Sequence, residues 1–139
     1  GQELLVNFKS GKFTTLNLDG NGRITGASMN LRFSLFNQTK STMKLRGVVG
    51  KVSVDGQSVA FIKRGPFIIG QGENSVTFPV DFQGEAVMAT LANALKKETP
   101  TFDVELTYKL PFFSYTDKFK MPPNEYLTKE VQNLLSFIR

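Results

Sequence analysis

Hydrophobic and polar residues alternate over most of this chain. The longest run covers 24–37, where Met29, Leu31, Phe33 and Leu35 occupy every second position. A spacing of two places successive side chains on opposite faces of a strand, so the run predicts a half-buried strand of an antiparallel sheet. The same pattern predicts further strands within 12–18, 43–54, 59–62, 67–69, 76–82, 102–108 and 112–121.

Glycine and proline divide these runs. Asp55-Gly56 is the strongest hairpin signal, because the favoured two-residue turns require positive φ. Gly47 and Gly50 indicate a bulge or bend within 43–54. Pro79 has no backbone N–H to donate to a ladder, so its strand is expected at a sheet edge or with a bulge.

Two segments change to helical spacing. Between 84 and 97, the residues Val87, Leu91 and Leu95 recur at intervals of four and predict one amphipathic helix. A second helix is expected after Asn124 and carries a single apolar stripe. The stripe is a possible interaction surface, formed by Leu127, Val131, Leu134, Leu135 and Ile138. It can pack on the chain's own domain or dock on a protein partner, and the sequence leaves both open.

Many short strands with one-sided alternation are typical of a β-sandwich. We therefore predict a mostly β fold, an antiparallel sandwich of seven or eight strands with one inserted helix and a C-terminal helix. The predicted organisation is an N-terminal segment over 1–11, a sandwich domain over 12–122 and the C-terminal amphipathic helix over 123–139. Thirteen phenylalanines and no tryptophan would supply the core.

Composition narrows the function further. The chain has 139 residues, enough for one domain, and contains neither cysteine nor histidine. Disulfides, thiolate metal sites, Ser-His-Asp triads and the usual zinc ligands are thereby excluded, and we expect a protein without enzyme activity or cofactor. The net charge of +5 is uneven, since 1–64 holds ten Lys or Arg against three Asp or Glu. These charges are interspersed, which favours a solvated strand face over a nucleic-acid site.

Three constellations offer candidate chemistry. The loop 17–28 places oxygen side chains and a glycine with calcium-loop spacing, but Ser28 stands where the bidentate glutamate belongs, so we predict a turn without metal. Asp103 and Glu105 share one strand face, as a carboxylate pair in a hydrolase could, although a solvated surface explains them better. Basic residues near Lys63-Arg64 interleave with aromatic ones that the core requires.

The second half of the chain resembles a known family. The stretch 77–82, the helix after it and the strand 102–108 together resemble the late embryogenesis abundant type 2 family, whose domain is also called WHy. The segments 110–113 and 119–122 are similar to its closing hairpin, and 29–37 and 52–60 to its earlier strands. The resemblance covers about 12–122. One departure is Gln38, which follows Asn37 where the family has the proline of an Asn-Pro signature.

The resemblance implies a fibronectin-III or immunoglobulin-like sandwich without catalytic residues. It also implies a non-catalytic module connected with stress response, or with the cell envelope, where some bacterial members are lipoproteins. Membrane association is expected only through an N-terminal anchor preceding Gly1. The alternative is a structural subunit of a virion or envelope complex that docks through 3–8 and the last helix.

Overall fold

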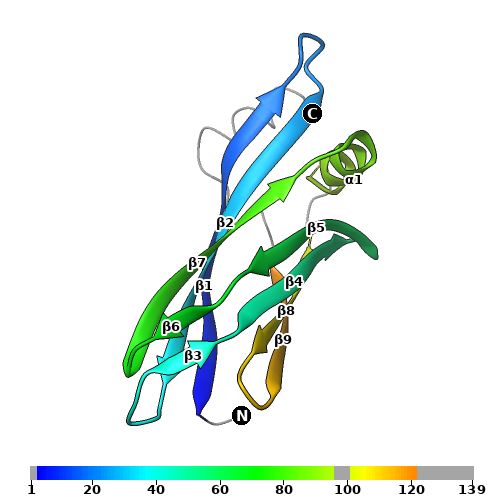
Figure 1. The fold of residues 1–139 in the computed structure, drawn as a ribbon. Helices are drawn as coiled ribbons and strands as arrows, with labels where there is room; N and C mark the ends of the chain where they lie inside the picture. Colours follow the sequence, from blue (N-terminus) through cyan, green and yellow to red (C-terminus); the bar gives the residue numbers. More distant parts are fainter. Residues whose placement is uncertain (1–2, 96–100, 122–139) are drawn as a thin grey trace.

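Nine strands and one helix form in residues 3–95 and 101–121, which the computed structural model describes (Figure 1). Their bounds are β1 (Leu4–Leu18), β2 (Ile24–Asn37), β3 (Met43–Leu45), β4 (Gly47–Val54), β5 (Gln57–Arg64), β6 (Phe67–Ile69), β7 (Gly72–Phe82), α1 (Glu85–Leu95), β8 (Phe102–Lys109) and β9 (Ser114–Met121). The final helix predicted over 123–139, with its apolar stripe, lies outside the described residues.

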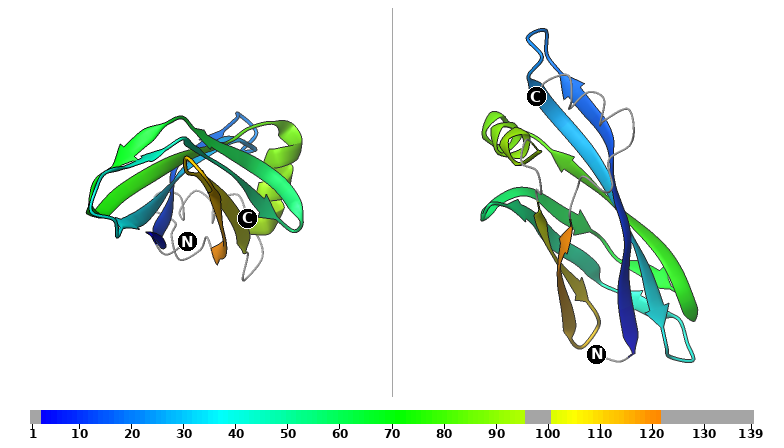
Figure 2. Two further views of the ribbon diagram at one scale, coloured as in Figure 1. Left: turned by 60° about the horizontal axis from the view of Figure 1, so that its bottom comes forward. Right: turned by 180° about the vertical axis from the view of Figure 1, so that it is seen from behind.

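The strands form two antiparallel sheets, which confirms the predicted β-sandwich. The first sheet has the order β1-β2-β7 and the second has the order β5-β4-β8-β9, while β3 and β6 form a separate short pair. The molecule is elongated (Figures 1 and 2). The β1–β2 turn and α1 lie toward one end, and the start of β1 and the β8–β9 turn lie at the other.

Aromatic side chains fill the space between the sheets. Along β2 the alternating residues Met29, Leu31, Phe33 and Leu35 are all fully buried, as their spacing predicted. The Phe13 ring of the first sheet lies 6.1 Å from that of Phe102 in the second, edge to face. Further along, Phe78 and Tyr108 face each other at 6.4 Å. Such ring pairs add a preferred geometry to the burial of large apolar areas.

The helix predicted over 84–97 is confirmed as α1. Its buried side chains are Met88, Leu91 and Ala94, which recur at intervals of three and therefore share one face. Glu85 stands in the first turn, where a negative charge is favourable. The helix packs chiefly against β2 and lies toward the end of the molecule that holds the β1–β2 turn (Figure 2).

Several strand bounds differ from the prediction. β1 begins at Leu4 rather than at 12, because Leu4–Phe8 pairs with the end of β2. The predicted strand 43–54 is divided into β3 and β4 at Arg46, whose N–H donates instead to the Lys109 carbonyl oxygen at 2.7 Å. These changes give nine strands in the described residues where seven or eight were expected.

Glycine and proline act partly as predicted. Asp55 (φ 51°) and Gly56 (φ 78°) form the two-residue turn between β4 and β5, with Val54 opposite Gln57. Pro79 lies in β7, at the edge of the first sheet, as expected. The bulge or bend expected within 43–54 takes the form of the break before Gly47 and a register shift between Val52 and Ser53, and neither lies at Gly50 itself. Gly50 instead permits close approach of β8, since a Cβ would lie 2.5 Å from the Glu105 carbonyl oxygen.

Candidate functional site

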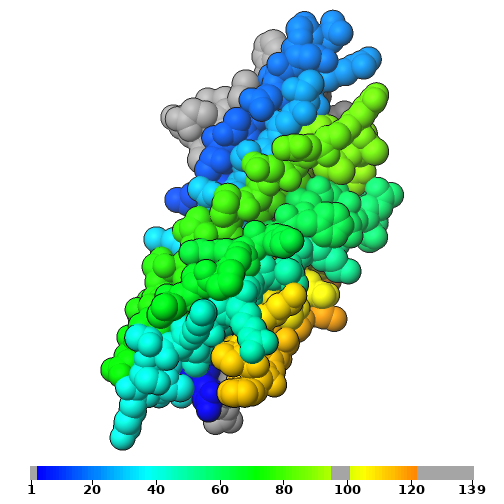
Figure 3. All heavy atoms as spheres, in the orientation of Figure 1, coloured from blue at the N-terminus to red at the C-terminus, as the bar shows by residue number. Residues whose placement is uncertain are grey.

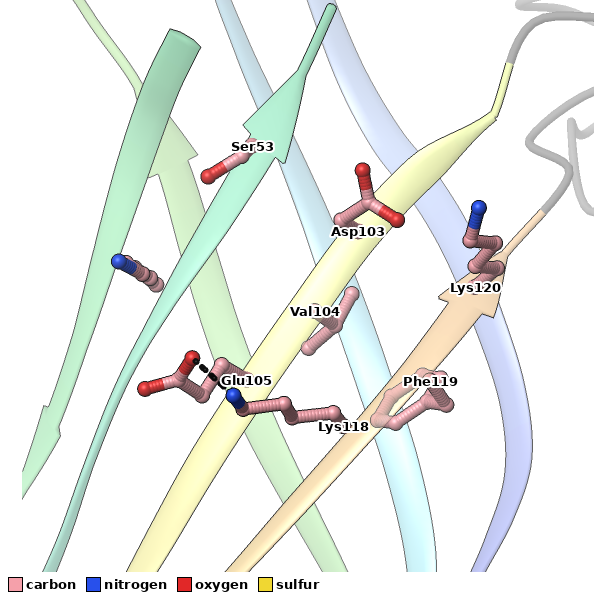
Figure 4. A pocket seen from close by; sticks show the side chains of 8 residues that line it. Ser53, Asp103, Val104, Glu105, Lys118, Phe119 and Lys120 are labelled. Atoms are coloured by element: carbon pink, nitrogen blue, oxygen red, sulfur yellow. Dashed lines mark ion pairs between the residues drawn. The ribbon is translucent and has the colours of Figure 1, made fainter. Parts of the chain in front are cut away.

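A groove of about 340 Å³ crosses the outer face of the second sheet (Figure 4). Antiparallel pairing brings its polar side chains into two rows across β4, β8 and β9. One row is Lys51, Glu105 and Lys118, and the other is Ser53, Asp103 and Lys120. Val104 and Phe119 complete the lining. The carboxylates predicted to share a face therefore do so, each opposite a lysine.

One ion pair crosses neighbouring strands in this groove. The Glu105 Oε2 atom lies 3.8 Å from Lys118 Nζ, with 38% of the glutamate side chain and 74% of the lysine side chain exposed. Ion pairs of such exposure contribute at most about 1 kcal/mol. A carboxyl that serves as a general acid is held in an apolar environment, whereas Asp103 is exposed and opposite Lys120. The groove therefore has the character of a solvated, charge-paired sheet surface.

The loop that imitates a calcium site is a turn stabilised by its own aspartate. Asp19 Oδ1 accepts hydrogen bonds from the backbone N–H groups of Arg23 (3.0 Å) and Asn21 (2.8 Å). These hydrogen bonds hold the pKa of the Asp19 carboxyl below its ordinary value, with the bond from Arg23 making the larger contribution and the bond from Asn21 the next largest. Strands β1 and β2 flank the turn, and Gly22 supplies a φ of 77°. Within the described residues, no group of three or more Asp or Glu could hold a metal ion.

A second groove, of about 640 Å³, lies between this turn and α1. Its walls combine apolar side chains of Ile24, Met88 and Ala92 with the polar groups of Asp19 and Arg23. No local pattern in the sequence predicts this groove, because it depends on how the β1–β2 hairpin and α1 are placed in space. Its chemistry is that of a mainly apolar surface depression beside two acidic side chains, Asp19 and Glu85, and one basic side chain, Arg23.

The basic residues around Lys63-Arg64 do not gather into one patch. Arg64 places its guanidinium 4.2 Å from the centre of the Phe67 ring and donates a 3.5 Å hydrogen bond to the Thr77 carbonyl oxygen. It thus links β5 to β6 and to the edge of the first sheet. Lys51 lies instead in the groove of the second sheet, opposite Phe61.

Asn37 and Gln38 both hold the end of β2 through hydrogen bonds. Asn37 is 1% exposed and donates from Nδ2 to the carbonyl oxygens of Ser41 (2.9 Å) and Gly70 (3.1 Å). Gln38 uses the N–H that a proline would lack, donating to the Glu3 carbonyl oxygen at 2.9 Å. That bond extends the pairing of the chain's first described residues with the end of β2.

Exposed apolar side chains are the feature that sequence reasoning missed. Phe112 is 97% exposed and Phe113 is 41% exposed, both in the β8–β9 turn, where a strand starting at 112 was predicted. Leu5 and Phe36 are opposite each other in β1 and β2 and are 43% and 40% exposed. Phe61, from a run predicted as strand 59–62, is 75% exposed. Turn residues and strand faces follow from pairing, which alternation alone does not reveal.

Known structures share this fold. A protein from Arabidopsis thaliana, solved in solution, has a TM-score of 0.55 at 12% identity, covering 88% of this chain and 82% of that one. The Northeast Structural Genomics Consortium target SoR45 has a TM-score of 0.53 at 8% identity, covering 91% of both chains. A protein from Archaeoglobus fulgidus has a TM-score of 0.51 at 11% identity, covering 83% of this chain and 98% of that one.

A protein described as putative late embryogenesis abundant has a TM-score of 0.48 at 9% identity, over 86% of this chain and 72% of that one. No family model and no curated protein matches the sequence. The likenesses therefore show the fold alone. Across residues 3–95 and 101–121, no helix has the length and apolar character needed to cross a membrane.

Proposed function

We propose that this chain is a non-catalytic binding or structural module, of the kind represented by late embryogenesis abundant type 2 proteins. The resemblance in 77–82 and 102–108 supports the proposal, as does the sandwich with one helix between strands of different sheets. Such a module would act in stress protection or at the cell envelope. It would need neither cofactor nor metal.

One observation carries the proposal: the side chains with candidate chemistry serve the fold or stand on an open surface. Asp19 binds two backbone N–H groups of its own turn, and Glu105 is paired with Lys118. Asn37 is saturated by loop contacts, and Arg64 joins two strands. Catalysis needs groups that are positioned toward a substrate and left available to it, which is a different arrangement.

Protection of an unrelated enzyme tests the stress-protection function. We expect the chain to preserve lactate dehydrogenase activity through drying, and we expect the double variant Asp103→Ala, Glu105→Ala to protect equally well. The variant Phe33→Ala, destabilised by loss of a buried ring, is the control for dependence on the stability of the fold. A chain that protects no better than albumin at equal mass would contradict this function.

The alternative function is that of a structural subunit of a virion or envelope complex. The segment 3–8, one of its two expected docking elements, is already paired with β2 from Leu4 onward. The apolar stripe of 127–138 is then the remaining docking element. Sedimentation of the full chain distinguishes the two functions, with Leu127→Gln, Leu134→Gln compared against Lys129→Gln, Glu130→Gln. Assembly that only the leucine pair abolishes would favour the subunit.

A further inference from the structure

The β8–β9 turn presents two phenylalanines to solvent at one end of the molecule. The Leu110 N–H donates to the Phe113 carbonyl oxygen at 2.9 Å, so 110–113 is a tight turn with Pro111 and Phe112 at its corners. Proline favours the first corner position, but a turn has no requirement for an aromatic residue at the second. Leu110 is buried and holds the base of the turn in the core. Phe112 is 97% exposed, so a polar residue at this position would serve the fold equally well.

We propose that this turn is a contact site for the surface of an anionic lipid bilayer, with Phe112 and Phe113 entering the interface. The turn lies beside the start of β1 at one end of the molecule (Figure 3), and an exposed aromatic pair fits the disordered headgroup region better than a shaped protein cleft. Aromatic rings are enriched at the level of lipid headgroups, where part of the ring is dry and the rest is hydrated. The inference is independent of any role in stress protection.

Basic side chains frame the turn. Lys109 is exposed and directly precedes it, and the Lys109 carbonyl oxygen accepts the Arg46 N–H at 2.7 Å, which places Arg46 on the neighbouring strand end. Lys44 and Arg46 alternate with the buried Met43 and Leu45, so the two cations share the outward face. These charges complement anionic headgroups.

Acidic groups at the same end lie further from the turn or are partly covered. Glu3 is exposed at the start of the described chain, Asp117 is half-buried in β9, and Glu73 is exposed on β7 opposite Phe36, in the other sheet. Leu5 and Phe36 lie on the outer face of the first sheet at this end, where β1 begins and β2 finishes. A molecule tilted onto the turn would bring these side chains toward the interface as well.

The absence of tryptophan from the chain allows a direct test. Phe112→Trp in the full chain introduces a single fluorescent reporter at the turn, and Phe61→Trp introduces one on the exposed face of β5. With vesicles of phosphatidylcholine and phosphatidylglycerol, we expect the Phe112→Trp emission to shift to shorter wavelength and to be quenched by brominated acyl chains. The Phe61→Trp emission should stay unchanged, because that position is away from the turn.

Loss of the aromatic pair provides the second arm. We expect Phe112→Ser, Phe113→Ser to lower vesicle binding at least about tenfold, given the apolar area withdrawn from water, while Phe61→Ser leaves it unchanged. Binding should be weaker on pure phosphatidylcholine vesicles, because the cations then lack a counterpart. Equal loss in both serine variants, or no shift for Phe112→Trp, overturns the proposal. So does self-association in sedimentation that Phe112→Ser, Phe113→Ser abolishes, because the turn would then bind a second copy.

Discussion

The two sheets of this sandwich reach close packing by different means. The first sheet presents large rings to the interior, among them Phe33, which contacts both Phe8 at 5.5 Å and Phe78 at 5.7 Å. The second sheet brings backbones together at Gly50, where a Cβ would meet the Glu105 carbonyl oxygen and Leu106. The turns of the two sheets differ in the same way. The β1–β2 turn of the first sheet is stabilised by the Asp19 side chain, whereas the β4–β5 turn of the second is determined by the backbone conformation of Asp55 and Gly56.

This difference teaches where each sheet tolerates change. A sheet organised by side chains is damaged by removing atoms, whereas a sheet organised by backbone contact is damaged by adding them. Substitutions at Phe33 in the first sheet and at Gly50 in the second should therefore have opposite size dependence.

The largest effect is expected for Phe33→Ala in the first sheet. The ring is fully buried and touches neighbours on β1, β7 and β9, so its loss leaves a cavity. We expect a decrease of about 3–5 kcal/mol in the free energy of unfolding, measured by denaturant titration. Phe61→Ala on the second sheet, where the ring is 75% exposed, is the control and should change stability by less than about 0.5 kcal/mol.

The converse test is Gly50→Ala in the second sheet. The added methyl group would collide with β8 backbone at 2.5 Å, so β4 and β8 must separate. We expect a loss of about 1–3 kcal/mol in thermal or denaturant unfolding. Gly20→Ala, which has no atom within 4 Å and no positive φ, should cost little. Equal stability of the two alanine variants would show that close backbone approach is unimportant here.

Gly56→Val probes the backbone-determined turn. At a φ of 78° a β-branched residue is strained, and we expect a cost of at least about 1 kcal/mol. Space is not the cause, since nothing lies within 4 Å of the added Cβ. Gly56→Asn should recover much of the loss, because asparagine tolerates this region. The melting midpoints of the two variants distinguish strain from crowding.

Tyr108→Phe should raise stability. The Tyr108 hydroxyl is buried and has no hydrogen-bond partner among residues 3–95 and 101–121, so its removal relieves a desolvation penalty of about 1 kcal/mol. Burial, and then the negative charge of Asp117, raises the pKa of Tyr108 above its ordinary value of about 10. The unfolded chain therefore releases this proton first, and stability falls as pH rises above about 10. Tyr108→Phe should reduce the loss of unfolding free energy above about pH 10, whereas Tyr115→Phe should leave the part due to Tyr108 in place.

The smallest effect concerns the side-chain-determined turn at Asp19. Because N–H groups of Arg23 and Asn21 lower the pKa of this carboxyl, its contribution is present above about pH 3.9 and is lost as pH falls through the lower, folded-state value. Asp19→Asn keeps an acceptor oxygen and should protect the Arg23 amide from hydrogen exchange at any pH. Asp19→Ala should lose that protection, and a fully protected amide in this variant would contradict the role of the side chain.

Local signals in the sequence were sufficient for elements whose geometry is set nearby. The bounds of β6 over Phe67–Ile69, the turn at Asp55-Gly56 and the edge position of Pro79 all follow from residue type and short-range spacing. Buried positions in β2 likewise match their alternation. These features depend on φ restrictions and on which face meets the core, and both are encoded within a few residues.

Features set by distant contacts were not predictable in this way. The break at Arg46 depends on a bond to Lys109, and the early start of β1 depends on pairing with β2. The outward direction of Phe112 depends on where β8 turns, since alternation continues through the turn without a visible change. The groove of the second sheet was anticipated only as a shared face for Asp103 and Glu105, because its lysines arrive from neighbouring strands.

The edge formed by β7 has a consequence for self-polymerisation. Arg64 bonds the Thr77 carbonyl oxygen from outside the first sheet, which shows that Thr77 directs its backbone groups away from β2. Pro79, two residues on, directs its backbone nitrogen the same way and offers no donor there. A strand from another molecule that approached this edge would find the Thr77 carbonyl oxygen already bonded and no N–H at Pro79. The edge is thereby protected against the strand-to-strand growth that leads to fibrils.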